Sequence, residues 1–287
     1  MDVRFPLKDV DVRLVAAART VEFPLYADKY WQMNQREFAM QVGGVADYYA
    51  CDGREVEYCP VDGADRNSME LYLNGSVYGA ILHQRKILPM HGSSFIYNGK
   101  GIMLCGEAGA GKSSLTASFC LDGAEFLTDD VTPIMLKDNA PFIWALSDRI
   151  KLWSDALKQL DIVNTGLNKI HPKTEKYYVP MDASSGYFIR LITVYILEMA
   201  DESKADIEEI SGSVKFAALR NEIYRVEYLK GMPENESFFF KNLVDISNLV
   251  KVFRFRRPEG AHVNEMKRFL EKHLFSLQQD MDPDGFN

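Results

Sequence analysis

The sequence predicts an α/β fold, and three observations lead to it. A hairpin signal and an apolar strand run into a glycine-rich loop at residues 106–113, a helix pattern follows, and another strand pattern comes directly after the helix. Before this unit, short alternating runs broken by Gly-Gly and Asp-Gly turns indicate a small β-rich module. We therefore expect a β-rich module over 1–67, an α/β core over 68–279 and a flexible tail over 280–287.

The strongest local pattern is the hairpin before the loop. Strand-like residues at 93–97 and 100–105 flank Asn98 and Gly99, and Asn-Gly accepts the positive φ angles of a two-residue type I′ turn. The second strand is continuously apolar and ends at Gly106, so it places the loop at its carboxyl end.

Other elements follow from periodicity and caps. A helix is expected from Ser68 to about Leu88, because its apolar residues suit one face. The remaining expectations are a helix over 112–121 closed by Gly123, strands over 124–128, 134–136, 142–146, 149–153 and 191–199, a helix over 154–160 capped by Ser154, and a last helix over 263–277.

Composition narrows the class of protein. The 287 residues are 47% hydrophobic and 26% charged, as in a soluble globular chain, and the net charge of -8 argues against general nucleic-acid binding. No apolar stretch approaches the roughly 18 residues of a membrane span, and the first residues lack the pattern of a signal peptide. The 4 cysteines show no metal-ligand spacing and suit a reducing compartment, so we expect a cytoplasmic protein without nucleic-acid or membrane partners.

The loop carries the clearest chemical signal. Its residues are Gly106, Glu107, Ala108, Gly109, Ala110, Gly111, Lys112 and Ser113, followed by Ser114, and they match GxxxxGK[ST] in full. The glycines let successive N–H groups point at an anion, and the following helix adds its positive end. Lys112 reaches the β- and γ-phosphates of a nucleoside triphosphate, and the Ser113 hydroxyl suits Mg²⁺.

A pair of acids, Asp129 and Asp130, decides among the functions that such a loop serves. The pair follows the strand after the helix, at the end of the sheet where ligands bind. One carboxylate there can hold Mg²⁺ while the other accepts a proton from an attacking hydroxyl. The residues alone leave these two roles open, and together they favour a kinase.

Several residues around the loop resemble a known family. His91-Gly92, the hairpin, the run GEAGAGKSS and the strand ending at Asp129-Asp130 resemble the catalytic core of the HPr kinase/phosphorylase superfamily, whose fold is related to phosphoenolpyruvate carboxykinase. The likeness is nearer to the HPr-kinase-like proteins of lasso-peptide and other peptide-modifying systems. It is sharp over 88–135, looser to 260 and weak before 70, and it implies a P-loop core with a mixed sheet.

The resemblance also implies roles for individual residues. Asp129 falls on the family's proposed base, which deprotonates a serine hydroxyl, and Asp130 falls on the metal-associated acid that acts with Ser113. His91 falls on a histidine near the transferred phosphate, so the expected catalytic residues are Asp129, Lys112 and His91. The family assembles as hexamers, which implies a homo-oligomer, although no residue in the sequence requires one.

Basic residues late in the core are candidates for the phosphate contacts. Arg149 and Arg220 are expected to neutralise charge on the γ-phosphate, and Arg225, Arg254 and Arg256 remain open.

A lysine-rich segment at 169–176 is either a substrate lid or a solvated loop.

The expected function is an ATP- and Mg²⁺-dependent kinase, or one using another nucleoside triphosphate, that phosphorylates a serine hydroxyl of a peptide or small protein such as a lasso-type precursor. The family signature linked to phosphorylase activity is absent from the sequence, so neither the reverse reaction nor HPr as acceptor is expected. One alternative is a kinase of a small hydroxyl metabolite such as free serine. Another is a nucleotide-gated peptide-binding module with little catalysis.

Overall fold

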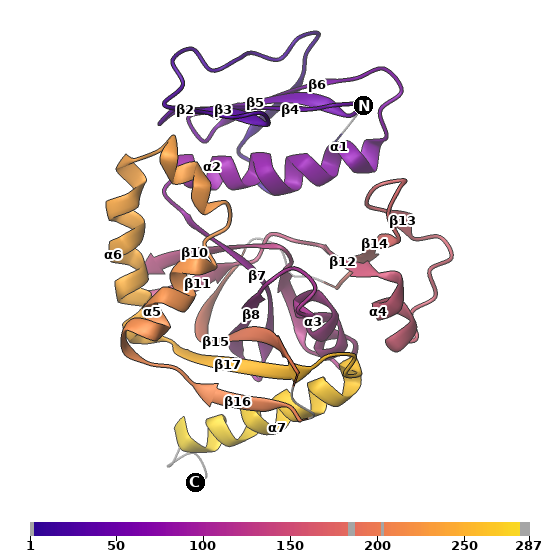
Figure 1. Cartoon of the computed structure of the whole chain (residues 1–287), viewed down its shortest axis with the longest axis vertical. Helices are drawn as coiled ribbons and strands as arrows, with labels where there is room; N and C mark the ends of the chain where they lie inside the picture. The colour runs from indigo at the N-terminus through magenta and orange to yellow at the C-terminus, as the bar shows by residue number, and fades with distance from the viewer. Residues whose placement is uncertain (1–2, 183–186, 202–203, 282–287) are drawn as a thin grey trace.

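The computed structural model describes residues 3–182, 187–201 and 204–281, which form a mixed α/β structure with several sheets (Figure 1). The last helix continues to Met281, four residues beyond its expected end at 277, and residues 282–287 of the expected tail lie outside the described part. Within the described residues, none of the helices is both long enough and apolar enough to cross a membrane.

The first sheet is built from the N-terminal strands. They are β1 (Asp11–Leu14), β2 (Tyr26–Ala27), β3 (Trp31–Met33), β4 (Glu37–Val42), β5 (Ala46–Cys51) and β6 (Glu55–Pro60), in the spatial order β1-β6-β5-β4-β3-β2. Only the β1–β6 pair is parallel. Side chains alternate along these strands. One face is apolar and includes Phe38 and Tyr48, whereas the other carries charged residues beside a small apolar cluster of Val21, Ala39 and Tyr49.

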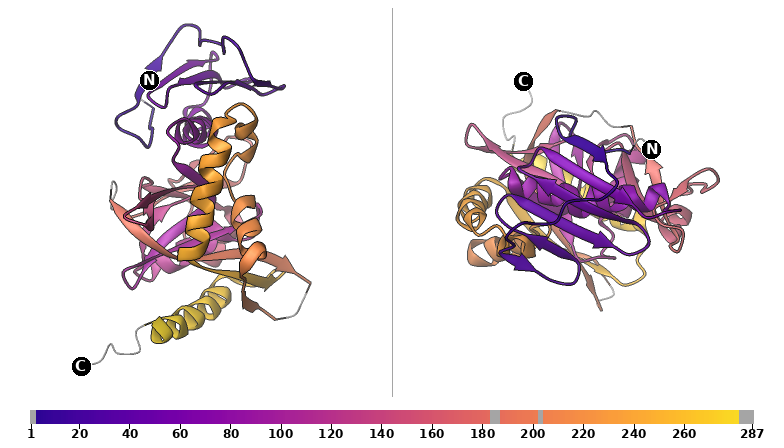
Figure 2. Two further views of the ribbon diagram at one scale, coloured as in Figure 1. Left: turned by 90° about the vertical axis from the view of Figure 1, so that its left-hand side faces the viewer. Right: turned by 90° about the horizontal axis from the view of Figure 1, so that it is seen from above.

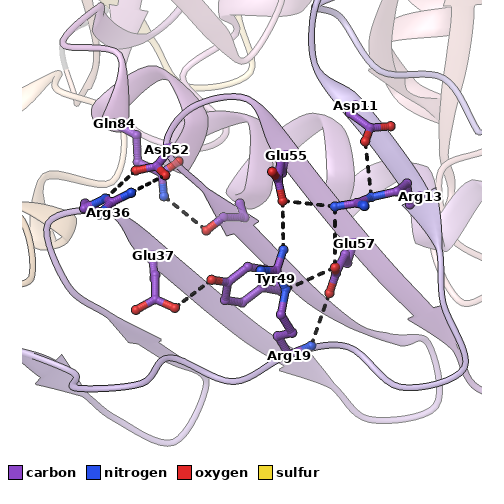
Figure 3. Close-up of polar contacts among 11 residues, drawn as sticks. Asp11, Arg13, Arg19, Arg36, Glu37, Tyr49, Asp52, Glu55, Glu57 and Gln84 are labelled. Carbon is purple, nitrogen blue, oxygen red and sulfur yellow. Dashed lines mark hydrogen bonds and ion pairs between the residues drawn. The ribbon is translucent and has the colours of Figure 1, made fainter.

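Charged side chains cover the polar face of this sheet (Figure 3). Arg19 pairs with Glu55 at 2.9 Å and with Glu57 at 3.1 Å. Arg36 forms a bidentate ion pair with Asp52. Arg19, Arg36, Asp52 and Glu55 are well exposed, so pairs among them contribute little to stability, whereas the Glu57 side chain is only 10% exposed.

A continuous helical run lies between the first sheet and the rest of the chain (Figure 1). It consists of α1 (Arg66–Tyr72), a π-helical turn (Leu73–Val77) and α2 (Tyr78–Gln84). The run begins two residues before the expected Ser68 because the Asp65 carboxylate caps it, accepting the Ser68 N–H at 2.8 Å. It ends before Leu88, which already belongs to a strand.

One hydrophobic cluster joins the first sheet to the elements below it. It contains Phe38 and Tyr48 of the sheet, Leu73 of the helical run, and Val131 and Tyr228 from later in the chain. The N-terminal sheet therefore shares its core with the rest of the molecule.

The central sheet is mixed. Its strands are β7 (Leu88–Tyr97), β8 (Lys100–Gly106), β9 (Glu125–Thr128), β10 (Val131–Lys137), β11 (Ala140–Trp144), β15 (Phe188–Ala200), β16 (Asp206–Glu209) and β17 (Lys251–Pro258). The order is β11-β10-β7-β8-β15-β17-β16, with β9 beside β7, and β15 runs parallel to both β8 and β17. The β7–β8 hairpin turns at Asn98 and Gly99, whose φ angles are 49° and 74°, as the Asn-Gly pattern predicts.

Helices cover the central sheet. The helix after the loop is α3 (Lys112–Leu121), with the predicted bounds, and it packs against α7 (Val263–Met281) through an apolar cluster that includes Phe119 and Leu270. The helix α6 (Glu234–Leu249) packs against the sheet through another apolar cluster, which includes Phe239 of the helix and Val194 of β15. Figure 2 shows α7 far from the N-terminal sheet.

Some helical features differ from expectation. The helix α5 (Gly212–Asn221), a short 3₁₀ helix (Val226–Lys230) and α6 were not predicted. In α6 the run of three phenylalanines hides the helical period, because Phe239 is buried while Phe238 and Phe240 are 38% and 54% exposed. The predicted Ser154 cap is wrong: α4 (Ser154–Gln159) has Trp153 at its N-cap position, and Ser154 is the first helical residue.

A small third sheet completes the fold. It consists of β12 (Arg149–Trp153), β14 (Lys176–Pro180) and β13 (Asn168–Lys169). The lysine-rich segment therefore lies partly in a hairpin that pairs with β12, next to the end of β9 that carries the paired acids.

Candidate active site

The glycine-rich loop leaves β8 at Gly106 and enters α3 at Lys112. Gly106, Gly109 and Gly111 have φ angles of 124°, 86° and 101°, which residues with a side chain rarely adopt. A Cβ atom on Gly106 would lie 2.3 Å from the carbonyl oxygen of Leu197 on β15. The loop can therefore approach the neighbouring strand only with glycine at this position.

Lys112 lies inside the loop rather than in solvent. Its side chain is buried, and its Nζ donates to the carbonyl oxygens of Gly106 at 2.5 Å and Glu107 at 3.0 Å. The ammonium group thus stands at the concave side of the loop, where it can meet the phosphates of a nucleotide.

Arg257 of β17 also binds the loop, and sequence reasoning missed it. Its Nε donates to the carbonyl oxygen of Ala110 at 2.6 Å and its Nη2 to that of Gly109 at 3.0 Å. Strand alternation contains the signal: Arg257 shares a face with the buried Phe253 and Phe255, which pack in the same cluster as α3.

Glu222, just after α5, anchors the start of the loop. Its carboxylate accepts the Gly106 N–H at 3.1 Å, and its backbone carbonyl accepts the His91 N–H at 2.6 Å. Burial raises the pKa of the Glu222 carboxyl, and the Gly106 N–H and the Lys112 charge oppose that rise. No sequence pattern pointed to this residue.

Asp129 stands at the end of β9 and connects it to the loop. Its Oδ1 accepts the Ser113 hydroxyl at 2.6 Å and its Oδ2 accepts the Lys151 N–H at 2.9 Å. The side chain is buried, with 7% of the residue exposed. Burial raises the pKa of this carboxyl above its ordinary value, although the charge of Lys151 pulls in the other direction.

Asp130 differs from Asp129 in its backbone conformation and in its hydrogen-bond partner. Its backbone is left-handed, with φ at 73°, and its Oδ2 accepts a hydrogen bond from Lys151 Nζ at 2.6 Å. Burial works against its ionisation, but the Lys151 ammonium outweighs burial and holds the pKa of Asp130 well below its usual range. The direct partner of Ser113 is therefore Asp129. The sequence analysis assigned Ser113 and Asp130 together to the metal, but these two side chains are not hydrogen-bonded to each other.

His91 of β7 lies beside Asp130. Its Nε2 is 3.8 Å from Asp130 Oδ1, and one third of its side chain is exposed. Burial lowers the pKa of the imidazole, and Lys112 adds to that effect more than Asp130 offsets it. His91 is thus neutral near pH 7 and can donate or accept a hydrogen bond at the site.

The two arginines expected at the γ-phosphate have other partners. Arg149 Nη2 donates to Glu70 at 2.8 Å, and its guanidinium lies 3.8 Å from the centre of the Tyr178 ring. Arg220 Nη2 donates to Glu236 at 2.8 Å on the exposed face of α5. The other candidates are also paired: Arg225 with Ser76 and Glu227, Arg254 with Glu198, and Arg256 with Asp206 and Glu208.

The oxygen donors fit Mg²⁺ bound mainly through a nucleotide. Among the residues that the structure describes, no group of three or more His, Cys, Asp or Glu side chains could hold a metal ion. Ser113, Asp129 and Asp130 offer one hydroxyl and two carboxylates at one end of the sheet. Mg²⁺ typically takes one or two such ligands and completes its shell with phosphates and water.

Two cavities lie near the candidate site residues, one beside the loop and one beside Asp129. One of about 350 Å³ is lined by loop residues from Gly109 to Gly111, by Ser114, and by apolar side chains such as Leu115 and Met266. The other, of about 640 Å³, reaches Asp129 and Lys151 from the side of the N-terminal sheet. Loop residues line the smaller cavity and Asp129 lines the larger one, and the Ser113–Asp129 hydrogen bond connects the loop to Asp129.

Comparison with known proteins gives distant structural likenesses only. No protein-family model matches the chain, and no curated protein matches it. Among solved structures, the chain is similar to the Hpr(Ser) kinase/phosphatase from Coxiella burnetii, with 13% identity and a TM-score of 0.34, over 66% of this chain and 98% of the other. A likeness of this degree does not assign the chain to a family, so its function must be inferred from the site itself.

Proposed function

We propose that the protein transfers the γ-phosphate of a nucleoside triphosphate, with ATP as the expected donor, to a hydroxyl group. The observation that carries the proposal is the hydrogen bond between Ser113 in the loop and Asp129 at the end of β9. It brings a phosphate-binding loop and a buried carboxylate into one site, next to a cavity large enough for an acceptor.

In this proposal the loop binds the triphosphate. The N–H groups of residues 107–109 and 111–113 and the Lys112 ammonium contact the phosphates, and Arg257 holds the loop by binding its carbonyls. Ser113 and Asp130 would hold Mg²⁺ together with phosphate oxygens. The bound ion would neutralise charge on the phosphates.

Asp129 serves as the base because it, and not Asp130, lines the larger cavity. As the acceptor oxygen forms its bond to the γ-phosphorus, the bond to the bridging oxygen of the nucleoside diphosphate breaks. The hydroxyl proton passes to the carboxylate of Asp129, whose raised pKa suits that role. Neutral His91 would hydrogen-bond the transferred group.

The acceptor expected from the sequence is a serine of a peptide or small protein. The alternative of a small hydroxyl compound is favoured by one observation, the walled cavity beside Asp129. A binding module without catalysis has no need of a buried carboxylate in contact with the loop, and this contact supports an enzyme.

The proposal is tested by incubating the protein with ATP, Mg²⁺ and candidate acceptors and detecting a gain of one phosphate by mass spectrometry. Lys112→Ala should abolish transfer, whereas Lys137→Ala, an exposed lysine at the end of β10, should not. If the wild-type protein binds ATP but phosphorylates none of the acceptors, it is a nucleotide-gated binding module.

A further inference from the structure

The larger cavity is assembled from segments far apart in the sequence. Residues 3–9 form one wall, the helical run contributes Leu71, Asn74 and Tyr78, and residues 144–149 close the other side. Asp129 and Lys151 are also part of its lining, so a molecule that fills the cavity lies next to Asp129. Arg4 ties these walls together, because its N–H donates to Glu70 and its guanidinium pairs with Asp148.

The lining of the cavity is largely apolar. Phe5, Leu71, Tyr78, Trp144 and Leu146 are among the lining residues, and Phe5 packs edge-on against the Tyr78 ring. The volume of about 640 Å³ lies within the range of roughly 300 to 1,000 Å³ that small-molecule sites occupy. Such a site gains affinity by removing the apolar part of a ligand from water.

Two polar groups in the lining have no hydrogen-bond partner within the described chain. The Tyr78 hydroxyl is buried without a hydrogen-bond partner among the described residues, which costs free energy. The Asn74 side-chain amide, which is half-buried in the π-helical turn, likewise bonds to none of the described residues. Single π-helical turns occur often at functional sites, because they re-aim side chains that a regular helix would point elsewhere.

The charges of the lining are mostly paired within the protein. The pairs are Arg4 with Asp148 at 3.1 Å, Arg149 with Glu70 at 2.8 Å, Lys151 with Asp130 at 2.6 Å and Asp9 with Arg85 at 3.0 Å. Lys8 is exposed at the rim. The larger cavity therefore suits a ligand without net charge.

We infer that this cavity binds the phosphoryl acceptor, and that the acceptor is a small uncharged hydroxyl compound with an apolar portion. The transfer step rests on the proposed function, whereas binding in the cavity does not. Its hydroxyl would lie at Asp129, its apolar portion between Leu71 and Trp144, and its polar atoms near Asn74 and Tyr78. Free serine, which is smaller and zwitterionic, would leave the apolar walls unfilled.

The test uses the full chain and a blocked serine, N-acetyl-L-serine benzylamide, as the probe. Binding is followed by saturation-transfer NMR with the corresponding alanine compound as a non-reactive analogue, and phosphate transfer by mass spectrometry. Free serine and a ten-residue serine peptide serve as rival acceptors. The cavity-filling variant is Leu71→Trp, and the matched control is Leu249→Trp, a partly exposed leucine at the end of α6.

We expect the wild-type protein to bind both blocked compounds and to phosphorylate the serine compound faster than free serine. Leu71→Trp should weaken binding of both compounds roughly tenfold or more while leaving ADP affinity unchanged, and Leu249→Trp should alter neither.

Undiminished binding of the blocked compounds to Leu71→Trp would overturn the assignment of the cavity. Phosphorylation of the peptide without binding of either blocked compound would overturn the small acceptor. If binding depends on the cavity as described but no acceptor gains phosphate, the cavity assignment stands as a ligand site and the proposed kinase function fails.

Discussion

Arg257 Nε donates to the carbonyl oxygen of Ala110 at 2.6 Å, so a side chain from the last strand of the sheet binds the middle of the glycine-rich loop. A second bond reaches Gly109 at 3.0 Å. Because the Ala110 carbonyl faces Arg257, the Gly111 N–H of the same peptide unit points away from Arg257, where it can face an anion, whereas the Ala110 N–H donates to the Glu107 carbonyl oxygen at 3.2 Å.

Replacing Arg257 should therefore weaken nucleotide binding. Arg257→Met removes two charge-assisted hydrogen bonds and is expected to lower the affinity for ATP roughly tenfold or more, as measured by titration calorimetry. The control is Arg254→Met on the opposite face of β17, where Arg254 pairs with Glu198. Equal losses in the two variants would show that the loop contact has no special role.

Substitutions of the two adjacent acids, Asp129 and Asp130, should impair different steps. Asp129→Asn is expected to abolish phosphate transfer while keeping ATP binding, because the base is lost and the amide can still accept from Ser113. Asp130→Asn should instead weaken the Mg²⁺-dependent part of ATP binding. The measurements are single-turnover transfer and calorimetry at two Mg²⁺ concentrations, with Asp138→Asn in an exposed turn as control. The opposite pattern would mean that the roles of the two acids are exchanged.

The pH dependence of transfer should reflect the buried base. Burial raises the pKa of Asp129 above the ordinary value of about 3.9, so the rate should fall as the pH drops through this raised pKa. Lys151 lowers the pKa of Asp129, and Lys151→Met should therefore move the acidic limb of kcat/KM to higher pH. A limb that stays in place, or moves to lower pH, would exclude Asp129 as the titrating group. Lys137→Met provides the control for the loss of an exposed lysine.

Two glycines of the loop should differ in their tolerance of a methyl group. Gly106→Ala places Cβ against the Leu197 carbonyl, and we expect a loss of about 3 kcal/mol or more in the free energy of unfolding. Gly109→Ala meets no atom within 4 Å and bears only the strain of its positive φ, about 1 to 2 kcal/mol. Chemical denaturation of the two variants compares these values, and equal losses would contradict the close approach of β8 to β15.

Local signals predicted the centre of the fold well. The Asn98-Gly99 turn and the bounds of α3 are confirmed, because each depends on residues that are neighbours in the sequence. The small residues of the loop likewise specify a strand, a turn and a helix without help from the rest of the chain.

The pairing of charged side chains could not be predicted in the same way. Glu70, which binds Arg149, is 79 residues away in the sequence, and Lys151 reaches Asp130 only because β12 lies beside the end of β9. The left-handed backbone of Asp130 also separates its carboxylate from that of Asp129, and no sequence pattern indicated that turn. The alternation of β17, by contrast, was visible and places Arg257 on the buried face.

The shared hydrophobic cluster between the first sheet and the later elements bears on how the molecule unfolds. Phe38 and Tyr48 lie in it together with Val131, which directly follows the paired acids. A chain shortened to begin at Arg66 would leave Leu73 and Val77 without their cover, and it should be recovered as aggregate. In calorimetry the intact protein should give a single transition, with ATP raising the temperature at which the N-terminal tyrosines become exposed. Binding of ATP to the glycine-rich loop would then also stabilise the N-terminal sheet.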